Sequence, residues 1–155
     1  MSLNELDLER LLLLTTYASK ENGVEEILGR TRFQKIVYII QHKFNLDRSE
    51  SGYQIHFFGP YSWSVQGSLD LLEIAGLIEE DAVPTDGYIQ YNYALTTLGK
   101  KVASKVFKNL SAESKNKLKK IGEEVKKLNK MSLPQVIKIA YDYARKDKRI
   151  SPYYH

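Results

Sequence analysis

The side chains able to do acid–base, nucleophilic or metal chemistry are few and widely separated in this sequence. The three histidines are His42, His56 and His155, and there is no cysteine. Metal sites and catalytic triads bring such residues together in recognisable patterns, and no zinc-protease, phosphate-loop or nucleophile-elbow motif is present. His42 is expected at an exposed helix position and His56 at the core edge. We therefore expect no catalytic residue, no metal site and no cofactor.

The composition is typical of one folded domain without disulfide bonds. The chain has 155 residues and a mass of 17.9 kDa, with 43% hydrophobic and 27% charged residues. Its longest aliphatic stretch is Leu11–Leu14, far short of the roughly 20 apolar residues of a membrane helix. Acidic Glu5, Asp7 and Glu9 stand where a secretion signal carries positive charge. We expect a single domain over residues 1–155, located in the cytoplasm and not in a membrane.

Charge is distributed unevenly along the chain, although the formal net charge is only +4. Residues 49–99 contain seven acidic residues and no lysine or arginine, whereas residues 100–155 contain sixteen basic and five acidic residues. Such asymmetry indicates an interaction surface or two poles that attract each other within or between chains. A solvated, lysine-rich helical face accounts for the basic part equally well.

Apolar spacing predicts several helices around one hairpin. Helices are predicted from Ser2 to about Lys20, from Thr31 to about Phe44, from Pro60 to about Ala75 and from Thr97 to Phe107, with two more opened by Ser111 or Ser114 and by Ser132. Three of them begin at capping boxes, which are Ser2–Glu5, Thr31–Gln34 and Ser132–Gln135. The segment between Gly23 and Gly29 is predicted to be helical, residues 53–58 to be extended, and residues 77–81 and 88–95 to pair as the hairpin.

The order helix, short strand, helix, hairpin, helix is typical of winged-helix proteins. The segment Leu69–Ile78 ends a helix at Gly76 and continues directly into a strand, and Tyr93–Lys100 closes the hairpin and enters the next helix, with Thr97 as its expected N-cap. The predicted fold class is mainly α with a small β-hairpin (α+β). We expect a winged-helix-like core over about residues 30–108 and a basic C-terminal helical extension over about residues 110–150.

Four segments carry a family resemblance: Thr31–Tyr38, Phe57–Ser62, Gly76–Ile78 and Leu95–Gly99. Over roughly residues 30–100 the chain resembles the Panacea (SocA-like antitoxin) domain and its prokaryotic relatives, with a looser likeness near Leu133 to Ser151. The resemblance implies a mostly helical domain with a small sheet. Some members neutralise toxins by direct protein contact, and others are adaptors. It implies no catalytic residues, and the lysine-rich C-terminal extension lies outside the pattern.

The acidic block and its aromatic residues favour a protein partner. About seven carboxylates would steer a basic partner, and toxins that act on RNA are often basic. Trp63 lies off the inner stripe of its helix and is a candidate anchor, whereas Phe57, Phe58 and Tyr61 are equally well explained as core. The predicted partner-binding residues are Trp63, Gln66, Glu79, Glu80 and Asp81. The function predicted is a non-catalytic binding module, either an antitoxin-like neutraliser or a regulatory adaptor.

The alternative function is that of a winged-helix transcriptional regulator that binds DNA. The recognition helix and the hairpin of this chain carry no basic residue, so phosphate contacts would come from lysines of the C-terminal helices. The candidate nucleic-acid-binding residues are Lys100, Lys101, Lys115, Lys119, Lys120, Lys126 and Lys127. Only Arg145 and Arg149 are arginines in residues 100–155, which favours backbone attraction over base reading. A homodimer stays open as a further alternative.

Overall fold

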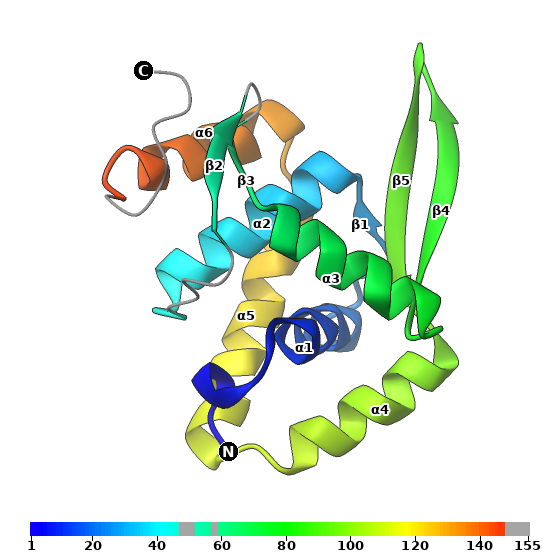
Figure 1. The fold of residues 1–155 in the computed structure, drawn as a ribbon, viewed down its shortest axis with the longest axis vertical. Coiled ribbons are helices and arrows are strands. Elements are labelled where there is room, and N and C mark those ends of the chain that lie inside the picture. Colours follow the sequence, from blue (N-terminus) through cyan, green and yellow to red (C-terminus); the bar gives the residue numbers. More distant parts are fainter. Residues whose placement is uncertain (47–51, 57–58, 148–155) are drawn as a thin grey trace.

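The computed structural model describes residues 1–46, 52–56 and 59–147 of the chain. These residues form six α-helices, one short 3₁₀ helix and five strands in two small antiparallel sheets (Figure 1). The fold is therefore mainly α within the α+β class, as predicted. The elements are η1 (Leu3–Glu5), α1 (Leu8–Glu21), β1 (Ile27–Leu28), α2 (Arg30–Lys43), β2 (Gln54–His56), β3 (Gly59–Tyr61), α3 (Trp63–Ile74), β4 (Ile78–Thr85), β5 (Tyr88–Leu95), α4 (Thr97–Lys108), α5 (Ala112–Lys130) and α6 (Leu133–Ala144).

Helices α1, α2 and α3 and the sheet β1-β5-β4 follow each other in the winged-helix order, with β4 and β5 as the wing (Figure 1). Strand β1 pairs with β5 through Ile27 and Tyr93. It lies in the segment between Gly23 and Gly29, for which the helix prediction is wrong. A two-residue strand exists only through its partner strand, which is distant in sequence. The winged-helix arrangement thus begins with α1, well before residue 30.

The wing is longer than predicted. Strand β4 continues beyond Asp81 to Thr85, and Pro84 lies opposite Ile89 in the ladder. The turn is reduced to Asp86 and Gly87, a pair that suits a tight hairpin because both residues tolerate turn conformations. The base of the wing is anchored in the core, where the rings of Tyr93 and Phe33 meet edge to face at 5.2 Å.

The start of α2 differs from the predicted capping box. Gly29, with φ of +93°, is the N-cap, and the helix begins at Arg30. The prediction of Thr31 as N-cap is therefore wrong. Gln34 does not reach back to its own helix. Its side-chain amide donates to the carbonyl of Ser62 at 2.9 Å and accepts from the Ser62 N–H at 2.9 Å.

Helix α3 also begins later than predicted. The sequence predicts that Gly59 and Pro60 open it, but they lie in β3, which pairs with β2. Ser62 is the N-cap, since its hydroxyl accepts a hydrogen bond from the Val65 N–H at 3.0 Å. Sequence rules favour proline in the first helical turn, but here Pro60 lies opposite Ile55 in the two-stranded ribbon.

Other helix starts are predicted correctly or displaced by a few residues. Ser111 caps α5, and the Ser132 capping box at the start of α6 is confirmed. Helix α4 is capped by Thr96 instead of Thr97, a shift of one residue. The capping box at Ser2 is present, but it lies at the start of the short 3₁₀ helix η1. The long helix α1 begins later and is capped by Asp7.

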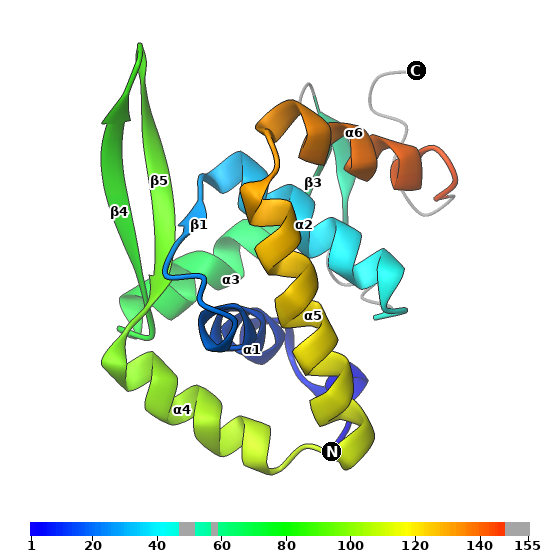
Figure 2. The ribbon, with the colours of Figure 1, turned by 180° about the vertical axis from the view of Figure 1, so that it is seen from behind.

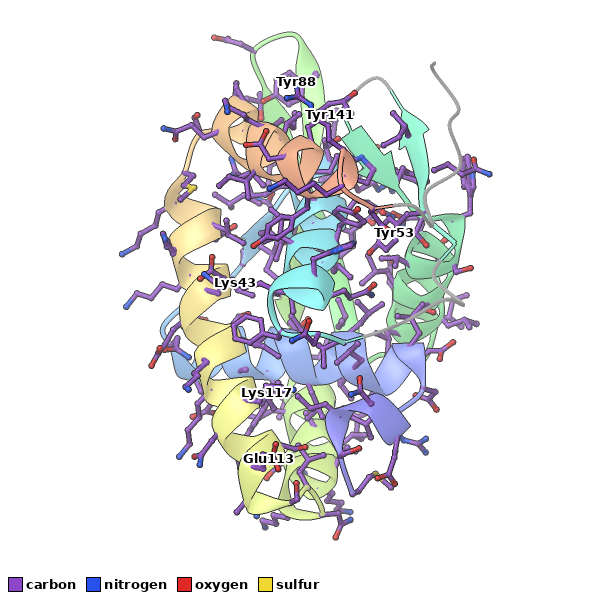
Figure 3. The ribbon with its side chains drawn as sticks, turned by 90° about the vertical axis from the view of Figure 1, so that its left-hand side faces the viewer. Lys43, Tyr53, Tyr88, Glu113, Lys117 and Tyr141 are labelled. Atoms are coloured by element: carbon purple, nitrogen blue, oxygen red, sulfur yellow. The ribbon has the colours of Figure 1, made fainter. Side chains whose placement is uncertain are left out.

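The C-terminal helices pack onto the winged-helix elements. Helix α5 contacts α1 and α2, and α6 contacts α2 and β3 (Figure 2). Figure 3 views the side on which α6 lies across α2. Asp147, just after α6, accepts a hydrogen bond from Tyr38 at 3.0 Å and lies 2.9 Å from His42 Nε2. His42 is thus mostly buried and bonded, which corrects its expected exposed position.

Among the described residues, no helix is long and apolar enough to cross a membrane. Some residues used in the sequence predictions lie outside the described part of the chain. These are Phe57, Phe58, Arg149, Ser151 and His155.

Lys35 is a buried lysine on the face of α2 that packs into the protein core. Its side chain is only 1% exposed, and no described residue forms an ion pair with it. The amine lies 5.8 Å from the centre of the Tyr61 ring, and a Cβ atom on Gly59 would lie 3.4 Å from Lys35 Cε, so the backbone of β3 lies against this side chain. Burial lowers the pKa of Lys35 to about 8. The unfolded chain, with an ordinary lysine, therefore holds a proton between about pH 8 and 10.5 that the folded chain has lost.

This difference predicts that the free energy of unfolding rises as the pH increases from about 8 to 10, because folding no longer buries a charge. Lys35→Met is expected to stabilise the protein at pH 7 by about 2 kcal/mol and to remove this rise. Urea unfolding at several pH values measures both effects. Lys105→Met, at an exposed position, is the matched control. A destabilised Lys35→Met protein with an unchanged pH profile would contradict the assignment.

Candidate partner-binding surface

Helix α3 presents an apolar stripe to solvent on the face opposite the core. We define this apolar stripe as Trp63, Gly67, Leu71 and Ile74, which follow each other at spacings of four, four and three residues. These spacings place them on one face of the helix. The three large side chains are 65%, 55% and 83% exposed, respectively. Large apolar side chains gathered on one exposed face are typical of an interaction site.

Two predicted partner-binding residues lie on this helix. Trp63 is the first residue of α3, and its ring meets that of Tyr61 edge to face at 4.9 Å. Gln66 is half-buried beside the apolar stripe, and its amide donates to the Asp70 carboxylate at 3.1 Å. Trp63 therefore offers a large exposed surface, whereas the Gln66 amide is already engaged by its own helix.

The three predicted acidic residues of the wing do not act as one cluster. Glu79 and Asp81 are exposed, and Glu80 points to the other face of β4, as the alternation of a strand requires. The Glu80 side chain is 11% exposed and forms an ion pair with Arg30 at 2.8 Å. Arg30 also lies over the ring of Tyr91 at 3.9 Å. Glu80 is therefore engaged within the chain, while Glu79 and Asp81 face solvent.

The exposed acidic residues of α3 and the wing make up what we call the acidic face: Asp70, Glu73, Glu79, Asp81 and Asp86. The ion pair with Arg30 keeps the Glu80 carboxylate charged. Burial has the largest effect and raises the pKa of Glu80, but the hydrogen bond and the charge of Arg30, together with the nearby Tyr93 hydroxyl, outweigh burial and lower the pKa overall. The pKa of Glu73 is raised by burial and by the nearby Glu80 and Asp70 carboxylates. Negative charges are therefore crowded on the wing side of α3.

Several exposed apolar residues escaped the sequence predictions. Leu71 and Ile74 belong to an aliphatic run that resembles core, and only their register opposite Val65 and Leu69 indicates exposure. On the wing, Val83, Tyr88 and Ile89 are also exposed because the hairpin extends beyond the core. Arg30 was missed as well, since its partner is fifty residues away.

The candidate DNA-binding lysines lie elsewhere on the molecule. Lys100 and Lys101 are on α4, and the other five are on α5. Lys115 is half-buried, with its amine 5.6 Å from the centre of the Phe107 ring, and the rest are exposed. None of these seven lysines forms an ion pair within the described residues. Helix α3 faces the viewer in Figure 1 and α5 in Figure 2, so α5 lies on the side of the molecule away from α3.

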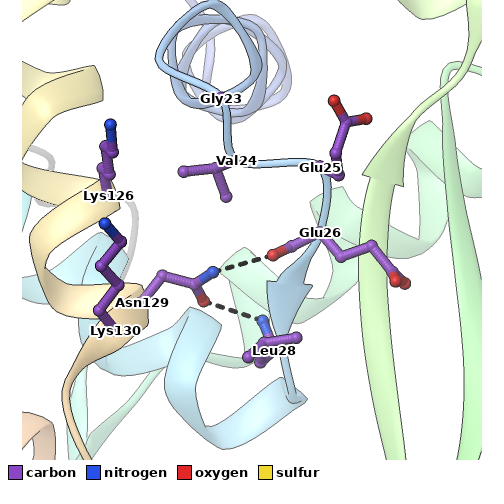
Figure 4. A pocket seen from close by; sticks show the side chains of 8 residues that line it. All are labelled: Gly23, Val24, Glu25, Glu26, Leu28, Lys126, Asn129 and Lys130. Carbon is purple, nitrogen blue, oxygen red and sulfur yellow. Dashed lines mark hydrogen bonds between the residues drawn. The ribbon is translucent and has the colours of Figure 1, made fainter.

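A hollow of about 300 Å³ lies between residues 23–28 and the C-terminal half of α5 (Figure 4). The Asn129 amide donates to the Glu26 carbonyl at 2.9 Å and accepts from the Leu28 N–H at 3.1 Å. Lys126 and Lys130 line the other side. The Asn129 side chain in this hollow is therefore already hydrogen-bonded to the backbone of the chain. Across the described ranges no group of three or more histidine or acidic side chains could hold a metal ion.

Comparison with known proteins adds one relative. No protein-family model matches the chain, so the resemblance to the Panacea domain stays a prediction. The chain is 38% identical over 74 residues to the uncharacterized protein YwgA of Bacillus subtilis (strain 168). The match covers 48% of this chain and 43% of that protein, so the chain corresponds to less than half of its relative's length.

Glu79 and Glu80 are neighbours, but only Glu80 forms an ion pair among the described residues, so the same substitution at each position can be compared. Glu80→Gln is expected to lower the free energy of unfolding at pH 7 by about 1 kcal/mol, because it leaves Arg30 without its ion pair. The stabilisation from Glu80 should be present above about pH 4.5 and disappear as the pH falls below it, since the folded pKa is depressed. Denaturant unfolding at pH 3 to 7 measures this. Glu79→Gln removes the same charge and should change little; an equal loss in both variants would refute the distinction.

Proposed function

We propose that this chain is a non-catalytic binding module that acts in the cytoplasm through a basic protein partner. The observation that carries the proposal is the exposed apolar stripe of α3 beside the acidic face. Apolar anchors surrounded by charge are the usual composition of a protein interface. A tryptophan that is 65% exposed provides such an anchor.

The charge of the surface indicates the chemistry of the partner. Five exposed carboxylates lie on α3 and the wing, and none of them forms an ion pair among the described residues, while Arg30 is paired with Glu80. A basic partner would be attracted, while a second copy docking through the same face would meet like charges. We therefore do not propose a homodimer through α3. The resemblance to antitoxin-like domains agrees with a basic toxin as the partner, which the module would neutralise or regulate.

Leu71→Asp tests this function because it places a charge within the apolar stripe. Affinity capture from cells of the source organism, followed by binding measurements with the purified captured protein, should give a basic protein whose affinity falls at least about tenfold in this variant. Asn116→Asp, which adds the same charge on exposed α5, should bind like the wild type. Capture that is equal in both variants, or lost equally in both, would exclude α3 as the binding surface.

DNA binding is the second candidate function, supported by the lysines of α4 and α5 that lack ion pairs among the described residues. Docking through α3 and the wing is disfavoured, since their exposed carboxylates would face phosphates. The exposed side of α5, a helix that the structure describes throughout, carries no large apolar residue and several lysines, which suits attraction to a phosphate backbone. Such binding would be independent of sequence, because lysine reads bases poorly.

A salt titration of binding to a duplex DNA oligonucleotide tests this second candidate. If α5 contacts the backbone, the logarithm of the affinity should fall linearly with that of the salt concentration, with a slope near −3 to −4 for about four contacts. Replacing Lys119, Lys120, Lys126 and Lys127 by Gln should abolish this dependence. Binding that is absent at low salt, or that survives the four replacements, would remove DNA as a ligand of α5.

A further inference from the structure

Gly67 is a costly residue that nothing in the described chain requires. It lies in the interior of α3, where glycine destabilises a helix relative to alanine because it has more freedom to lose on folding. A Cβ atom built at Gly67 would meet no atom within 4 Å. The helix could therefore carry alanine here without any clash.

The other two helical glycines show what an internal requirement looks like. A Cβ atom on Gly122 would lie 2.6 Å from the Ala18 carbonyl oxygen, so α5 and α1 can approach each other only because it is absent. A Cβ atom on Gly99 would overlap the Leu77 carbonyl group. At both positions a second backbone occupies the space of the missing side chain. At Gly67 that space is open to solvent.

Gly67 also stands at the centre of the apolar stripe, between Trp63 and Leu71 and seven residues before Ile74. These positions span three helical turns, or about 16 Å along the helix axis. Large side chains at the ends and no side chain in the middle form a saddle. Such a shape fits a helix that crosses α3 and approaches it closely, toward the lower end of the 8–10 Å range of interaxial distances.

Charge surrounds this saddle asymmetrically. Asp70 and Glu73 lie on the flank of α3 nearest to Glu80, where the three carboxylates act on one another. The opposite flank carries neutral serine hydroxyls, and that of Ser68 donates to the Glu9 carboxylate of α1 at 3.3 Å. More negative charge therefore gathers on the wing side of α3, and a cation placed there would relieve its crowding.

We infer that the partner segment is a basic amphipathic α-helix that crosses α3 at Gly67, with its apolar side on Trp63, Leu71 and Ile74 and its cations toward Asp70 and Glu73. This inference rests on the proposed function, and it adds the conformation, charge and contact point of the segment. Recognition of this kind, a helix laid on an apolar surface, places anchors at i, i+3 or i+4 and i+7 of the bound helix.

Peptide display on the 155-residue chain tests the inference even while the partner is unidentified. Two libraries are selected in parallel, one of helix-forming peptides of about 18 residues and one of unconstrained peptides of equal length. The enriched binders are expected to be helical and basic, with apolar residues at helical spacing. Trp63 is the only tryptophan, so a synthetic binder seated on α3 should shift its fluorescence emission to shorter wavelength.

Gly67→Leu then fills the saddle and should weaken the selected peptide at least about tenfold, whereas Asn116→Leu, the same side chain on α5, should leave its affinity unchanged. Gly67→Ala should raise the melting temperature of the free protein and still weaken binding. Circular dichroism verifies that each variant is folded. Acidic or extended binders, no binders, no emission shift, or full affinity in Gly67→Leu would overturn the inference. A partner sensitive to Leu71→Asp but not to Gly67→Leu would leave the proposed function standing and remove only the helix crossing.

Discussion

Two hydrogen bonds between Gln34 and Ser62 determine how α3 is presented. Both residues are fully buried, and the side-chain amide of Gln34 satisfies both the N–H and the carbonyl of Ser62. Ser62 in turn caps α3 with its hydroxyl. An unsatisfied buried polar group costs about 1–3 kcal/mol, so this junction strongly favours one starting point for α3. The start of a helix determines which residues face inward, and here it leaves Trp63, Leu71 and Ile74 outside.

The charge distribution of the chain is separated in space as well as in sequence. Helix α3, which carries Asp70 and Glu73, lies on one side of the molecule, and the lysine-rich α5 lies on the other (Figures 1 and 2). The exception is Arg30, which α2 brings from a neutral part of the sequence to Glu80. One ion pair neutralises the carboxylate nearest the core, while Glu79 and Asp81 remain exposed. At physiological salt such charges act within about 8 Å, so the two sides can meet different ligands.

Features predicted correctly from the sequence depend on neighbours in the chain. Ser111 and Ser132 cap helices because their hydroxyls need only the N–H groups of the next turn. The second wing strand, residues 88–95, follows from its alternation. The features that were missed depend on distant residues. Strand β1 exists because β5 lies beside it, and Pro60 lies in a strand because β2 and α6 surround it. No local pattern contains that information.

The same distinction separates two residues of this chain that break local rules, Lys35 in the core and Gly67 on the surface. Lys35 violates the preference for exposed charge, but it lies beneath β3 and α6, so its reason is to be sought within the fold. Gly67 violates helix propensity and Ile74 violates the preference for polar surfaces, and no packing within the described residues accounts for either. Residues that break local rules without an internal benefit tend to serve function. Gly67 and Ile74 lie on one face of α3, beside carboxylates that form no ion pair among the described residues, and this is the face to which the proposed partner helix would bind.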